Sequence, residues 1–135
     1  MMARPKSMWA SLFLLWLFSS AAVYAQRIGR REYLGEANVN GARDHDNIVV
    51  TAARGAFRAI QIRVENGAIH FDRVVVHYGN GSSSPIEIRR RIPAGDQTRV
   101  IDLPGGRRMI RSVEFWYRRG TWGGRPPKVR LFGFR

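Results

Sequence analysis

Cysteine is absent from the 135 residues of this chain. A fold without cysteine is held by packing and hydrogen bonds alone, and it offers neither a thiol nucleophile nor a thiolate metal ligand. Lysine is nearly as scarce, because Lys128 is the only lysine after residue 25. About 110 residues can bury one hydrophobic core without covalent cross-links, so we expect a single domain.

Long hydrophobic runs are also missing, apart from one near the N-terminus. Arg4 and Lys6 precede an apolar run from Met8 to Phe18, and Val23-Tyr24-Ala25 supplies small residues for a cleavage site. That run has about 11 residues, against the roughly 20 that a membrane-spanning helix needs. We therefore expect residues 1–25 to be a cleaved signal peptide. The mature chain would then have no transmembrane segment and would be periplasmic or secreted.

Acidic residues are outnumbered, with 10 Asp and Glu against 23 Lys and Arg. Loss of Arg4 and Lys6 leaves 21 basic residues, so the mature chain carries a formal charge of +11, and all but one of its basic residues are arginine. The planar guanidinium pairs bidentately with phosphate and carboxylate groups, so this composition favours polyanionic partners. The alternative is a compositional bias that places arginines on outward strand positions, where they keep a sheet soluble.

No stretch after the signal peptide has the 3.6-residue period of an amphipathic helix. Apolar residues instead alternate with polar ones in short runs, which are clearest at 57–65, 73–78, 100–103 and 109–117. Eight or nine such strands at about ten-residue spacing predict an all-β domain over residues 30–135. We expect an antiparallel β-sandwich of jelly-roll or immunoglobulin-like type.

The same patterns predict several local features. Asn66-Gly67 matches a tight hairpin turn, because both residues accept positive φ at low cost. In the last long run, Met109, Val113, Phe115 and Tyr117 share one parity and are expected to face the core. Residues 39–46 and 118–127 are polar and glycine-rich, and we expect both to be loops.

The order of short phrases along the chain resembles a known family. The phrases include Tyr33-Leu34-Gly35-Glu36, residues 44–50, Tyr78-Gly79-Asn80-Gly81, Ile92-Pro93-Ala94-Gly95 and residues 99–105. Together they are similar to the YaaI-like family of small exported bacterial proteins of unknown function, across nearly the whole mature domain. The resemblance implies export and a β-fold. It implies no catalytic or ligand-binding residue, because its phrases are turn glycines and strand apolars.

Two groups of residues suggest chemistry on inspection. Asp44 and Asp46 are the candidates for a bound cation, but no EF-hand spacing or trailing glutamate accompanies them, and aspartate before a strand is a frequent turn residue. His70 and His77 precede three serines, yet no Gly-x-Ser-x-Gly elbow is present. The sequence therefore predicts no metal site, no cofactor and no enzymatic activity.

The predicted ligand-binding residues are Arg118, Arg119, Trp122 and Arg125. Trp122 lies among glycines and would provide a stacking surface, while the three arginines would grip anionic groups. We expect a non-enzymatic module that binds anionic polymers such as lipopolysaccharide, acidic glycan or nucleic acid. The alternatives are a carbohydrate-binding module that uses loop aromatics and a structural or assembly protein of the cell envelope.

Overall fold

The computed structural model describes residues 29–41, 43–51, 54–88, 91–120 and 124–135. The chain divides into residues 1–30, of which only the last two are described, and Arg31–Arg135, which forms one compact unit. The predicted signal peptide and its cleavage site therefore lie outside the described residues. Within the described ranges, no helix is long and apolar enough to cross a membrane.

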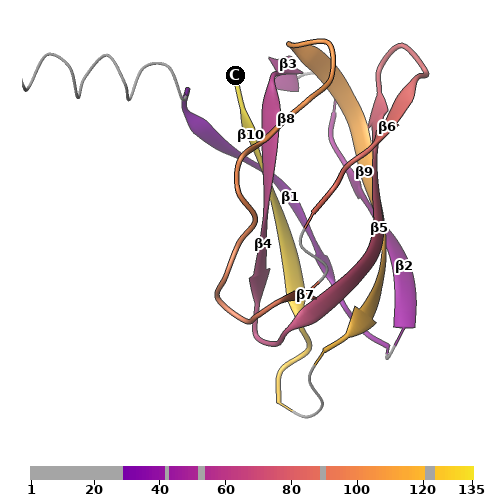
Figure 1. Cartoon of the computed structure of the whole chain (residues 1–135), viewed down its shortest axis with the longest axis vertical. Coiled ribbons are helices and arrows are strands. Elements are labelled where there is room, and N and C mark those ends of the chain that lie inside the picture. Colours follow the sequence, from indigo (N-terminus) through magenta and orange to yellow (C-terminus); the bar gives the residue numbers. More distant parts are fainter. Residues whose placement is uncertain (1–28, 42, 52–53, 89–90, 121–123) are drawn as a thin grey trace, which may run out of the picture. The chain divides into compact units, whose positions relative to one another are not determined.

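The unit from Arg31 to Arg135 is an all-β antiparallel sandwich of two sheets, as predicted (Figure 1). One sheet has the order β1-β10-β4-β8, and the other has the order β2-β9-β5-β6, with β3 paired to β9 and β7 paired to β5. Their bounds in chain order are β1 Arg31–Asn38, β2 Arg43–Val49, β3 Ala56–Phe57, β4 Ala59–Glu65, β5 Ile69–Tyr78, β6 Ser83–Pro85, β7 Arg91–Ile92, β8 Ile101–Asp102, β9 Arg108–Arg119 and β10 Lys128–Phe134.

The core lies between the two sheets and is built from alternate strand residues. Each sheet contributes fully buried apolar and aromatic side chains, which include Phe57, Ile60, Ile62, Val64, Ile69, Val113, Phe115, Tyr117, Val129 and Leu131. β10 is central in its sheet, and its second half is buried on both faces from Leu131 to Phe134. This half of the closing strand is therefore covered on both faces.

Asn66-Gly67 makes a turn, but not the predicted hairpin. Asn66 has the positive φ of 68° that the pattern indicates. β4 before it and β5 after it belong to different sheets, however, so the turn carries the chain across the sandwich. The prediction was wrong because turn chemistry fixes the reversal of the chain and not the partner with which each strand pairs.

β9 changes parity along its length, which corrects the predicted core. Its register against β5 shifts between the partners of His77 and Tyr78, so Ile110 turns inward and Met109 becomes 45% exposed. Beyond the shift, Val113, Phe115 and Tyr117 are fully buried, as predicted. β9 continues to Arg119, so the predicted loop of residues 118–127 begins only at Gly120.

Candidate functional site

The predicted ligand-binding residues do not form one loop cluster. Arg118 and Arg119 are the last two residues of β9, and neighbouring strand residues point to opposite faces of a sheet. Arg118 donates to Asp72, with Nη2 to Oδ1 at 2.9 Å, while the Arg119 Nε is buried without a hydrogen-bond partner in the described part of the chain. Arg125 is exposed between β9 and β10. Trp122 lies outside the described residues, so its role stays a prediction.

The segment with the candidate cation ligands is a strand and not the predicted loop. β2 begins at Arg43 and includes both aspartates. Asp46 Oδ1 accepts from the backbone N–H of Asn47 at 2.8 Å, and the side chain of Asp44 is outside the described set. Among the side chains that are described, no group of three or more His, Asp or Glu residues could hold a metal ion.

A cluster that the sequence did not indicate lies on the outer face of the six-stranded sheet. Glu114 of β9 bridges two histidines from the strands on either side, because His45 Nε2 lies 2.6 Å from Oε2 and His77 Nε2 lies 2.9 Å from Oε1. Hydrogen bonds from His77 and then His45 hold the pKa of Glu114 below its usual value of 4.5. Ser83 is opposite His77 in register, but no hydrogen bond joins a described serine to this imidazole.

Trp116 occupies the next outward position of β9, beside this cluster. The His45 ring from β2 stacks on it at 4.6 Å between centroids, and the Arg73 guanidinium from β5 lies 5.0 Å from its ring centroid. β2 and β5 flank β9 on opposite sides, so the two faces of the indole are covered by different neighbours. Trp116 therefore strengthens the sheet and leaves little open surface for stacking on a ligand.

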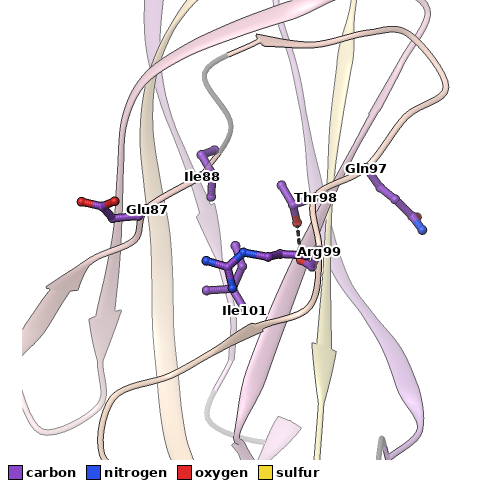
Figure 2. Close-up of a pocket in the computed structure, with 6 residues that line it drawn as sticks. All are labelled: Glu87, Ile88, Gln97, Thr98, Arg99 and Ile101. Atoms are coloured by element: carbon purple, nitrogen blue, oxygen red, sulfur yellow. Dashed lines mark hydrogen bonds between the residues drawn. The ribbon is translucent and has the colours of Figure 1, made fainter.

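A shallow hollow of about 410 Å³ opens between residues 87–88 and residues 97–101 (Figure 2). Ile88 and Ile101 supply its apolar wall, and Arg99 also lines it (Figure 2). The Glu87 carboxylate points away from Arg99, which has no carboxylate partner in the described ranges. A second hollow of about 310 Å³ shares Glu87 and Ile88 and includes Arg73. Both hollows combine arginine with apolar surface.

Basic side chains on the outer face of the four-stranded sheet are paired with carboxylates. Glu36 lies 3.0 Å from Lys128 Nζ and 3.7 Å from Arg130 Nε, and Glu65 lies 3.2 Å from both Arg63 and Arg130. Hydrogen bonds from Tyr33 and Lys128 lower the pKa of Glu36. Three cations share two carboxylates, so this group keeps one excess positive charge, but each of its cations already has an acidic partner.

Other arginines have no such compensation. Arg31 and Arg73 are exposed without a carboxylate partner, but they lie over the rings of Phe132 and Trp116. Five further arginines of the unit from Arg31 to Arg135 are exposed and contact neither a carboxylate within 4.0 Å nor an aromatic ring in the described part of the structure: Arg91, Arg99, Arg107, Arg111 and Arg125. They come from β7, β9 and three loops. Sequence composition indicated the excess of arginine, but the division between paired and unpaired arginines depends on strand register, which composition does not reveal.

Comparison with known proteins gives one family and one fold. No curated protein sequence matches the chain. The solved structure of AlgX from Pseudomonas aeruginosa superposes with a TM-score of 0.51 at 12% sequence identity, over 78% of this chain and 27% of AlgX. At that identity the likeness supports the sandwich fold alone, and the chain spans about a quarter of the AlgX chain. A family model described as a domain of unknown function, DUF2541, matches residues 9–133. Because this match covers most of the chain, the protein belongs to the DUF2541 family.

Proposed function

We propose that this protein is an exported, non-enzymatic binding module that holds anionic polymers of the cell envelope through its arginine surface. The observation that carries the proposal is the set of five exposed arginines that contact neither a carboxylate nor an aromatic ring among the described residues. Guanidinium groups that are not neutralised within the protein attract polyanions over several ångströms and pair bidentately with their anionic groups. The resemblance to YaaI-like periplasmic proteins agrees with this location and remains part of the proposal.

The exposed arginines favour polyanion binding over sugar recognition by stacking. A carbohydrate-binding module needs open aromatic faces, and Trp116 has His45 and Arg73 against its ring. Tyr33 is 42% exposed, but its hydroxyl donates to Glu36 at 2.7 Å. Stacking by Trp122 stays the second candidate, and a structural role is the third.

Retention of the purified protein on immobilised polymers tests the proposal. We expect retention on heparin and on polygalacturonate at low salt, elution as the salt concentration rises, and no retention on neutral dextran, because screening weakens contacts between exposed charges. Retention on dextran that salt does not reverse would instead support sugar stacking. Failure to bind any of the three polymers at low salt would contradict both binding functions and favour the structural role.

A further inference from the structure

Two arginines and a histidine from three different strands lie in one row at one end of the six-stranded sheet. Strand register places His70 of β5 opposite Arg91 of β7 on one side and opposite Arg118 of β9 on the other. The ends of these three strands gather at the bottom of Figure 1. Neighbouring strands are about 4.8 Å apart, so the backbones of consecutive members of the row are separated by roughly that distance.

The row faces away from the core. Its members are next in sequence to three buried residues, Ile92, Ile69 and Tyr117, which are 1%, 0% and 0% exposed. Alternate residues of a strand point to opposite faces, so the members of the row point outward together. Arg91 is exposed, and His70 and Arg118 are half-buried.

Arg91 and Arg118 lie on either side of His70, so two positive charges are about two strand spacings apart. In the described ranges, the carboxylate that contacts a member of the row is that of Asp72, and its partner in the row is Arg118. It receives Arg118 Nε at 3.2 Å and Arg118 Nη2 at 2.9 Å. Asp72 lies where the register of β5 against β9 shifts, between Phe71 and Arg73.

The bond to Asp72 orients Arg118 without neutralising the row. The carboxylate occupies the Nε and Nη2 edge of the guanidinium, so the Nη1 donors stay available to a ligand. Arg91 has no carboxylate partner among the described residues. Two guanidinium groups and one carboxylate leave an excess positive charge.

The surroundings of the row indicate the chemical class of the ligand. Single-stranded nucleic acids bind proteins by stacking bases on open aromatic faces. Trp116, the aromatic residue of β9 nearest to the row on this face, has its ring between His45 and Arg73. A polysaccharide with anionic groups at intervals needs no stacking surface, and guanidinium forks recognise those groups directly.

We propose that Arg91, His70 and Arg118 form a binding site for an acidic polysaccharide, which runs across the strands of the sheet. This inference rests on the proposed function and gives it a location and a ligand class. Carboxylate and sulfate groups share the chemistry that the row recognises. Polygalacturonate and heparin are therefore the probes that distinguish recognition of carboxylate from recognition of sulfate.

The test compares two variants that each remove one exposed arginine charge. Arg91→Gln alters the row, whereas Arg107→Gln alters the turn before β9, at the other end of that strand. Neither arginine has a carboxylate partner in the described ranges, so both variants should keep the melting temperature of the original protein. We expect Arg91→Gln to weaken binding to polygalacturonate or heparin about tenfold, as loss of a charge-assisted contact would. Arg107→Gln removes one charge of the wider arginine surface but none of the row, so it should weaken binding only about twofold.

The possible outcomes distinguish a failure of the proposed site from a failure of the proposed function. Equal losses in the two variants would overturn the row and leave polyanion binding by diffuse charge intact. If the unaltered protein bound neither polymer at low salt, the proposed function itself would fail. Stronger binding to single-stranded oligothymidylate than to both polysaccharides, with the same dependence on Arg91, would overturn the ligand class.

Discussion

Glu114 is the residue on which the outer face of the six-stranded sheet depends most. Its carboxylate joins β2, β9 and β5 through His45 and His77, and no other described carboxylate connects three strands in this way. Asn47 and Val75 are its register partners on the two flanking strands, and neither side chain can be ionised. Removal of Glu114 would remove the carboxylate that Nε2 of each imidazole contacts.

The lowered pKa of Glu114 gives a prediction about acid stability. A carboxyl whose pKa is depressed by folding stabilises the native state above its unfolded pKa, and that contribution is lost as the pH falls through the folded value. We expect the unfolding midpoint in urea to fall for the unaltered protein between pH 7 and pH values below 4.5, the usual pKa of this carboxyl. In Glu114→Gln the midpoint should be lower at pH 7 and should change less with acid.

Glu87→Gln is the matched control, because Glu87 is exposed and has no hydrogen bond or ion pair in the described ranges. Its midpoint should follow that of the unaltered protein at both pH values. If Glu114→Gln and Glu87→Gln had the same acid profile, the bridge between the histidines would contribute nothing measurable to stability.

At the scale of elements, the close packing of β10 against Leu34 of β1 and Phe57 of β3 depends on Gly133. A Cβ atom at this position would lie 2.6 Å from Phe57 Cδ1 and 2.9 Å from Leu34 Cδ1, and both side chains are buried. We expect Gly133→Ala to lower the free energy of unfolding by about 1–3 kcal/mol, which is the usual cost of overpacking a core. Chemical denaturation measures the loss.

Gly79→Ala is the comparison for this prediction. Its added Cβ would be 3.4 Å from the nearest atom, the Cβ of Met109, so the neighbour needs to move little. The variant should lose much less stability than Gly133→Ala. Equal losses would mean that contact with Phe57 and Leu34 does not determine the cost at Gly133.

The sequence predicted the elements whose apolar residues alternate and missed those whose residues do not. The alternating runs at 57–65 and 109–117 predicted a sandwich, because burial of one face of a strand produces such alternation. β2 went unrecognised through Arg43–Asp46 because it lies at a sheet edge, and Ile48 is its one residue that the structure describes as buried. The parity change in β9 arises from a register shift against β5, which no pattern within one strand encodes.

The candidate site was less predictable than the fold for the same physical reason. Arg118 was predicted to bind a ligand from within a loop, but it is a residue of β9, and its register neighbourhood contains His70 and Arg91, which are 48 and 27 positions away in sequence. Strand order and register bring these residues together. A search for charged residues within one loop could not find them.

At the scale of the whole molecule, the unpaired arginines should be dispensable for folding. Replacement of all five by glutamine removes five positive charges from exposed positions and breaks no ion pair among the described residues. We expect the melting temperature to stay the same or to rise, because exposed substitutions usually cost under about 0.5 kcal/mol each and self-repulsion decreases. Retention on heparin should be lost. A folded variant that still bound heparin as the original protein does would show that these arginines are not the binding surface.

The most direct measurement of the central claim is the equilibrium binding of the purified protein to polygalacturonate at salt concentrations between about 50 and 200 mM. Binding through several arginine contacts releases condensed counterions, so the logarithm of the binding constant should fall linearly with the logarithm of salt concentration. The account predicts a steep negative slope that becomes clearly shallower in Arg91→Gln and changes less in Arg107→Gln. A slope near zero, or no binding at the lowest salt concentration, would contradict the account.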